Sequence, residues 1–101
     1  MNDNYLNEIR GFLDGEGKPR AIPAKRRKQL IVLFLIAESI PAGREWNERE
    51  LNAFLMTLHG FGDPAWIRRE LCDLGVLERD PYGKRYVRAE NPPTLEEALA
   101  R

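Results

Sequence analysis

Residues 47–88 read NERELNAFLMTLHGFGDPAWIRRELCDLGVLERDPYGKRYVR, and this segment contains the signals that set the architecture. Asn47 and Glu50 are spaced as a capping box, in which each side chain bonds the backbone N–H of the other residue at the start of a helix. Apolar residues then recur on one helical face as far as Leu58. The glycine-rich residues 60–62 predict a turn, so this helix should end near His59.

A second helix and a β-hairpin follow that turn. Asp63 is suited to cap the helix, and Gly75 is suited to the left-handed backbone that ends one. Residues 76–79 and 85–88 predict two strands around a turn at 80–83, which contains Pro and Gly. Helix, turn, helix and hairpin in this order predict a winged helix-turn-helix-like domain, mainly α with a small β-hairpin.

Flanking segments extend this unit on both sides. Residues 4–13 predict a short amphipathic helix at the N-terminal side. Pro23 is suited to the first turn of a longer, mostly buried helix that should run to about Ile40. Residues 44–46 are expected to add a short third strand, and a capping-box pattern predicts a last helix over 95–100. The domain thus has extra N- and C-terminal helices.

Length and composition favour one cytoplasmic domain. A chain of 101 residues is expected to form a single domain over 1–101, with a core at about 5–89 and a helical tail at 90–101. The single cysteine, Cys72, excludes an internal disulfide and fits a reducing compartment. The longest apolar run covers residues 30–37, far short of the about 20 residues of a membrane span. No leader peptide is recognised, so neither secretion nor membrane contact is expected.

Charge is balanced in total but unevenly distributed. Sixteen basic and sixteen acidic residues cancel, which counts against a strong nonspecific DNA binder. Because electrostatic fields are local at physiological salt, a neutral total can still contain a basic face. Basic residues gather before the buried helix, in the second helix of the central unit, and in or beside the hairpin. The candidate nucleic-acid-binding residues are Lys25, Arg26, Arg27, Lys28, Arg68, Arg69, Arg79, Lys84, Arg85 and Arg88.

Each basic group also has a purely structural interpretation. Arg69 is spaced to pair with Asp73 four residues on, and the acids of this helix would repel phosphates. Residues 25–28 cover a full helical turn and form either a phosphate clamp or a solvated face. The hairpin residues either contact phosphates or a minor groove, or protect an edge strand from aggregation.

Catalytic and metal sites are not indicated. His59 is the only histidine and Cys72 the only cysteine, so we expect neither a zinc site nor a nucleophile–base pair. Trp46 is expected to pack inside, whereas Trp66 is expected at the rim of the buried side, where an exposed part could anchor a partner. We therefore predict a protein that is not an enzyme and uses no cofactor.

Six short motifs occur in a fixed order along the chain: FL at 12–13, IPAKRRK at 22–28, NERELN at 47–52, IRREL at 67–71, GVLER at 75–79 and YVR at 86–88. With them, the segment from Phe12 to Arg88 resembles a bacterial family catalogued as domain of unknown function 2087. Members of that family stand alone or follow a helix-turn-helix domain in transcriptional regulators. The resemblance implies a bacterial, regulation-associated domain and implies no activity.

These observations favour a small bacterial domain that binds double-stranded DNA or works in transcription regulation. The alternative is a protein-interaction or dimerisation module of the same architecture, which the neutral net charge favours; its terminal helices would serve as dimer arms. A third option is a small-molecule sensor with a pocket between the first helix and the core. A single face shared by the hairpin, Arg69 and residues 25–28 would favour DNA.

Overall fold

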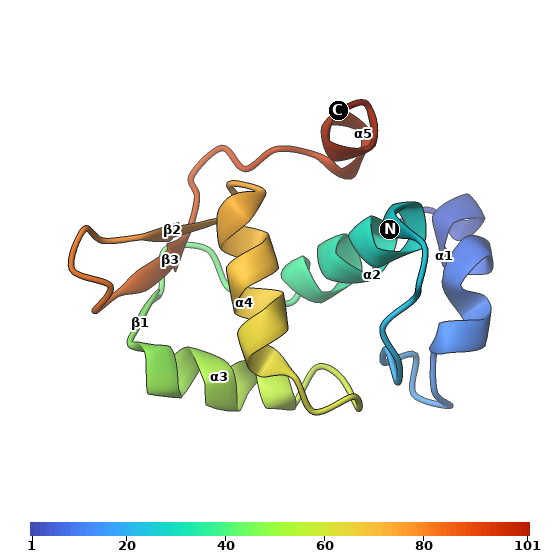
Figure 1. Cartoon of the computed structure of the whole chain (residues 1–101), viewed down its shortest axis with the longest axis horizontal. Coiled ribbons are helices and arrows are strands. Elements are labelled where there is room, and N and C mark those ends of the chain that lie inside the picture. Colours follow the sequence, from blue (N-terminus) through green and yellow to red (C-terminus); the bar gives the residue numbers. More distant parts are fainter.

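Five α-helices and a small antiparallel sheet make up the computed structural model, which describes residues 1–101 (Figure 1). The prediction of a mainly α chain with a small β-hairpin is confirmed. No helix combines the length and apolar character that a membrane span needs. The elements in chain order are α1 (Asp3–Ile9), the 3-10 turn η1 (Arg10–Phe12), α2 (Arg26–Ala37), β1 (Glu45–Trp46), α3 (Glu48–Met56), α4 (Pro64–Asp73), β2 (Leu77–Arg79), β3 (Tyr86–Arg88) and α5 (Leu95–Leu99).

The sheet has the strand order β1–β3–β2, so the last strand lies in the middle. Trp46 of β1 pairs with Tyr86 of β3, and Glu78 of β2 pairs with Val87 of β3. The hairpin and the third short strand are therefore confirmed. Figure 1 shows the sheet beside α3 and α4, on the side of the molecule away from α1.

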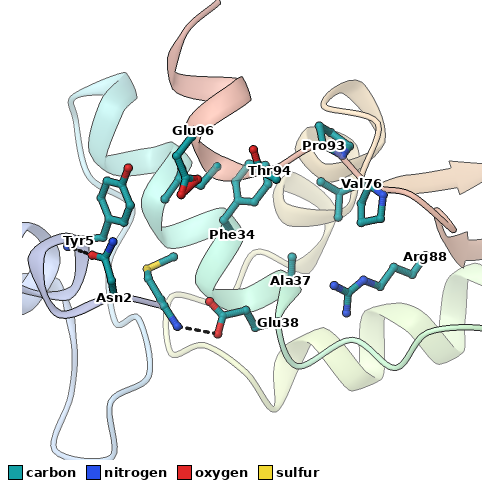
Figure 2. A pocket seen from close by; sticks show the side chains of 13 residues that line it. Asn2, Tyr5, Phe34, Ala37, Glu38, Val76, Arg88, Pro93, Thr94 and Glu96 are labelled. Carbon is teal, nitrogen blue, oxygen red and sulfur yellow. Dashed lines mark hydrogen bonds and ion pairs between the residues drawn. The ribbon is translucent and has the colours of Figure 1, made fainter.

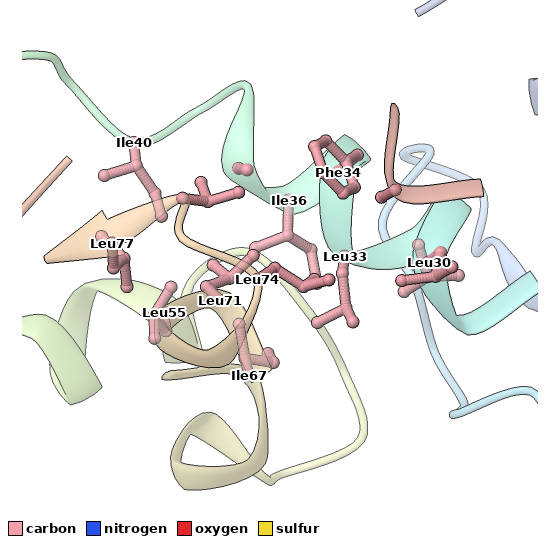
Figure 3. Close-up of a cluster of buried hydrophobic side chains, with 14 of the residues drawn as sticks. Leu30, Leu33, Phe34, Ile36, Ile40, Leu55, Ile67, Leu71, Leu74 and Leu77 are labelled. Carbon is pink, nitrogen blue, oxygen red and sulfur yellow. The ribbon is translucent and has the colours of Figure 1, made fainter. Parts of the chain in front are cut away.

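Helix α2 forms the centre of the hydrophobic core. Its apolar middle is buried on almost all sides, as the sequence predicts. Figure 3 shows Leu33 and Ile36 of α2 facing Ile67 and Leu71 of α4. Because burying one such side chain stabilises the fold by about 1.5–3 kcal/mol, this contact fixes α4 firmly on α2. The other elements contribute further residues to the same cluster: Leu51, Leu55, Leu77, Tyr86, Leu95 and Ala98.

The predicted caps of α3 and α4 are confirmed. The Glu50 backbone N–H donates to Asn47 Oδ1 at 2.7 Å, and the Asn47 N–H donates to Glu50 Oε1 at 2.9 Å. Asp63 Oδ1 accepts from the Trp66 N–H at 3.0 Å. After α4, Gly75 has a φ of 82°, which a residue without a Cβ adopts at little cost. These local interactions set where α4 begins and where the chain turns toward the hairpin.

Several predicted helix boundaries are wrong. Pro23 does not open α2, because the helix begins at Arg26 with Lys25 as its N-cap. Pro23 is instead buried, and its carbonyl oxygen accepts a hydrogen bond from Gln29 Nε2 at 2.8 Å. This bond holds the proline outside the helix. At their other ends, α2 and α3 stop at Ala37 and Met56, each followed by tightened i→i+3 bonds rather than further α-helix.

The N-terminal segment is tied to the turn between α3 and α4. Its regular helix ends at Ile9, earlier than predicted, and continues only as η1. Leu13 then forms an isolated bridge with Pro19, and the Gly60 N–H donates to the Pro19 carbonyl at 2.8 Å. A hydrogen bond thus connects two loops that lie far apart in the sequence.

Helix α5 packs on the core through Leu95 and Ala98, both of them buried. The predicted capping box is confirmed, since Thr94 and Glu97 exchange both hydrogen bonds. Figure 1 shows α5 and α1 at two different places around α2. The two terminal helices therefore cover the central helix of their own chain.

Candidate functional site

A cleft of about 420 Å³ lies between α4 and the β-hairpin. Arg68 and Arg69 enter it from α4, and Arg79 and Tyr86 enter it from the two hairpin strands. Cys72 and Asp73, one turn further along α4, complete its lining. Three of the candidate arginines therefore come together here, with a single carboxylate among the lining residues.

Arg68 is held in place from several sides. Its Nη1 donates to Asn52 Oδ1 at 2.6 Å, and its Nη2 lies 3.5 Å from Glu48 Oε1. The guanidinium carbon also lies 5.8 Å from the centre of the Tyr86 ring. Only 12% of the side chain is exposed. Because two elements fix its position and Glu48 offsets its charge, Arg68 acts mainly as a support for the cleft.

Arg69 and Arg79 are exposed and have no ion-pair or side-chain hydrogen-bond partner. The pair between Arg69 and Asp73, which is the structural alternative for this residue, does not form. Arg79 reaches toward the hairpin turn, where its guanidinium lies 3.8 Å from the position that a Cβ of Gly83 would occupy. Two guanidinium groups that line the cleft are therefore exposed and unpaired.

Cys72 lies in an environment that disfavours its thiolate form. Burial raises the pKa of its thiol, and the positive charges of Arg79 and Arg68 only partly oppose that effect. A raised pKa leaves less thiolate at neutral pH, and the thiolate is the nucleophilic form. No cluster of metal-binding side chains is present in the chain.

The tip of the hairpin has one paired and one free cation. Arg85 forms an ion pair with Glu45 of β1. The Lys84 side chain has no such partner, although its backbone N–H donates to Asp80 Oδ1 at 2.8 Å. Tyr82 is 84% exposed, more than any other large hydrophobic residue. Lys84 is thus the unpaired cation of the hairpin turn, and Tyr82 is its most exposed large side chain.

The basic residues 25–28 contact α1, η1 and α4, and two of them are paired. Arg26 lies 2.8 Å from Glu70, and Arg27 binds both carboxylate oxygens of Glu8, at 2.8 and 2.9 Å. The hydrogen bond between Arg27 and Glu8 lowers the pKa of the Glu8 carboxyl group and raises the pKa of the Arg27 guanidinium. Lys28 lies 5.8 Å from the centre of the Phe12 ring, which leaves Lys25 as the exposed, unpaired member.

Arg88 lies apart from the cleft. Its Nη1 donates to the Ile40 carbonyl at 2.9 Å, and it lines a different cavity next to α1 and α2. The candidate residues therefore do not form the single basic face that would favour DNA, and only the arginines of α4 and β2 lie together. Three line the cleft, two flank the hairpin turn, four lie around the start of α2, and one lies at another cavity.

Both tryptophans lie where the sequence predicts them. Trp46 is 2% exposed and stacks on Phe54, with ring centres 4.9 Å apart. Trp66 is partly exposed and makes an edge contact with Phe61. One contact was not foreseen: the Arg44 guanidinium lies 3.7 Å from the centre of the Trp46 ring. Its signal was a basic residue two positions before the strand tryptophan, which is the spacing of side chains on one face of an extended segment.

The chain belongs to the bacterial family described as "Uncharacterized protein conserved in bacteria (DUF2087)", whose model matches residues 20–88. The matched span begins before α2 and ends with β3, so it contains the whole cleft. Helices α1 and α5 lie outside it. No curated protein and no solved structure shows significant similarity to the chain.

Proposed function

We propose that this chain is a small winged helix-turn-helix-like domain that binds nucleic acid in bacterial transcription regulation, without a catalytic step. The order α2, β1, α3, α4, β2, β3 supports the architecture, because a winged domain places a short strand before its second helix and a hairpin after its third. In this arrangement α4 is the recognition helix and the β2–β3 hairpin is the wing.

The observation that carries the proposal is the pair of unpartnered guanidinium groups of Arg69 and Arg79 at one cleft. Arginine binds phosphate through parallel N–H donors, and such charge-assisted bonds are about twice as strong as neutral ones. One of these residues lies on α4 and the other on the hairpin, so one duplex backbone would contact both elements. Lys84 adds a third free cation near the hairpin turn.

The paired cations contribute less to this binding. Arg26, Arg27 and Arg85 already have carboxylate partners, and a phosphate would have to displace them. We therefore assign phosphate contact to Arg69, Arg79 and Lys84, which are the exposed, unpaired candidates of α4 and the hairpin. Three contacts give a slope of log K against log salt of about −3, which corresponds to weak, salt-sensitive binding.

A protein-interaction module of the same architecture is the second candidate. It is supported by the highly exposed Tyr82 and by the pairing of several cations within the chain. Tyrosine and arginine are enriched among the residues that dominate protein interfaces. In this case Tyr82 and Arg79 would contact a partner protein in place of DNA.

Fluorescence anisotropy with a random duplex of about 20 base pairs, at roughly 50 and 200 mM salt, tests the first candidate. The double variant Arg69→Gln, Arg79→Gln is expected to lose most affinity, and each lost phosphate contact reduces the salt slope by about 1. The matched control Arg27→Gln, Arg85→Gln removes the same net charge from paired positions and should retain the slope.

Equal losses in the two double variants would mean that net charge, and not the cleft, determines binding. Absence of binding by the unmodified chain at low salt would overturn the nucleic-acid proposal. The interaction module would then be tested by Tyr82→Ala against any partner recovered with the full chain.

A further inference from the structure

A second cavity, of about 350 Å³, lies between α1, α2 and the segment that leads into α5 (Figure 2). Phe34 and Ala37 of α2 and Val76, which follows α4, provide apolar side chains to it. Its volume is within the range of about 300–1,000 Å³ that small-molecule sites occupy. The cavity is separate from the α4–hairpin cleft, with which it shares no lining residue.

The walls of this cavity come from both ends of the chain. Tyr5 of α1 lines one side, and Pro93 and Thr94 line another. Both α1 and α5 pack on α2, and Leu95 is part of the core. Because packed elements hold these walls, binding of a ligand would order few additional residues.

Arg88 supplies the only cationic side chain that lines the cavity, and this guanidinium has no ion-pair partner. It is half-buried, and Figure 2 shows its guanidinium directed toward Ala37 and Glu38 at one end of the cavity. Nη1 donates to the Ile40 carbonyl, but no carboxylate lies within ion-pair distance of the group. Its remaining N–H donors have no protein acceptor, and a partly buried, unpaired charge is costly unless an anion binds it.

The other charged groups limit what the anion can be. Glu38 forms an ion pair with the Met1 amine, with 3.1 Å between the nitrogen and Oε1. Glu96 lies on the side of the cavity away from Arg88 in Figure 2. These carboxylates would repel a second negative charge on a ligand. The charge pattern therefore fits a molecule with one anionic end and an apolar body.

We propose that this cavity binds a small amphipathic monocarboxylate, with its carboxylate on Arg88 and its apolar body against Phe34, Ala37 and Val76. Arginine matches a carboxylate through two parallel N–H donors, which favours this group over a neutral amide. The proposal does not depend on nucleic-acid binding, since none of the residues assigned to phosphate lines this cavity.

The test uses 4-phenylbutyrate as the probe, titrated into the ¹⁵N-labelled full chain while backbone amide shifts are followed. At about 0.3 kcal/mol per non-hydrogen atom, a ligand of this size binds with a dissociation constant near the millimolar range. Saturable shifts are expected at Ala37, Val76 and Arg88. The neutral isostere 4-phenylbutanamide should bind at least about tenfold more weakly, because it lacks the charge-assisted bond.

Arg88→Gln is expected to abolish the preference for the acid over the amide. Arg79→Gln, which removes a charge from the other cleft, should retain it. If Arg88→Gln fails to fold, the comparison of acid and amide on the unmodified chain still decides. Equal affinities, shifts confined to α4 and the hairpin, or no saturation at millimolar probe would each overturn the assignment.

Discussion

His59 stabilises the turn between α3 and α4 through bonds to the backbone. It is 5% exposed, its Nδ1 lies 2.7 Å from the Leu55 carbonyl oxygen, and its Nε2 accepts from the Asp63 N–H at 3.0 Å. Because a backbone N–H can only donate, the tautomer that satisfies both partners has its proton on Nδ1. The sequence indicated only a histidine near a helix end, since backbone partners leave no side-chain pattern.

Cys72 is expected to react slowly with alkylating reagents. Burial raises the pKa of its thiol, so at about pH 8 its thiolate fraction is below that of a free thiol. Iodoacetamide should therefore modify the folded chain more slowly than N-acetylcysteine, as followed by mass spectrometry. Arg79→Gln removes a charge that favours the thiolate and should slow the reaction further, whereas denaturant should abolish the protection. A rate equal to that of the free thiol would contradict this environment.

At the scale of elements, local signals predicted caps better than helix boundaries. The capping pairs of α3 and α5 lie within four consecutive residues each, so their pattern is visible without tertiary information. The start of α2 depends instead on the burial of Pro23 and its bond to Gln29, which come from packing. Pro23 is suited to the first turn of a helix, but α2 begins three residues later, at Arg26.

Leu95→Ala is expected to lower the free energy of unfolding by about 2 kcal/mol, near the lower limit for a buried leucine, because α5 is short and terminal. Leu95 is 6% exposed within the core cluster. Urea unfolding of the full chain measures the change through the midpoint at constant m-value. Glu96→Ala, an exposed neighbour on the same helix, is the control and should stay within about 0.5 kcal/mol. No difference between the variants would mean that α5 is detached in solution.

At the scale of the whole molecule, the sequence predicted the cleft only in part. Adjacent elements α4 and β2 bring Arg68, Arg69 and Arg79 together, as expected for a helix followed by a hairpin. The ion pairs Arg27–Glu8 and Arg85–Glu45 join residues 19 and 40 positions apart. Such distant partners depend on how elements pack. The composition therefore gives the net charge of the chain, but it does not show which arginines are paired with carboxylates.

Acid is expected to destabilise the chain through Glu8 and Asp14. Hydrogen bonds lower the pKa of Glu8 below 4.5, mainly from Arg27, and that of Asp14 below 3.8, from the backbone of residues 18 and 16. A depressed folded-state pKa adds stability that is complete above the unfolded value and is lost as the pH falls through the folded value. The free energy of unfolding should therefore decrease with acidification below these ordinary values. Urea unfolding at several acidic pH values measures this loss.

The double variant Glu8→Gln, Asp14→Asn should flatten that pH dependence, because amides do not titrate in this range. Glu78→Gln on the exposed hairpin is the matched control and should leave the slope as it is. An unaltered slope in the double variant would show that other carboxylates determine the acid response.

The residues that line the cavity next to Arg88 come from different parts of the chain. Phe34, Ala37, Val76 and Arg88 lie inside the matched span of residues 20–88, whereas the side chains of α1 and α5 lie outside it. For the ligand site proposed above, substitutions in these terminal helices would therefore alter the walls that contact the ligand body and leave the Arg88 guanidinium in place. Redesign of the two ends alone would accordingly change the selectivity of the proposed site without touching its anchor.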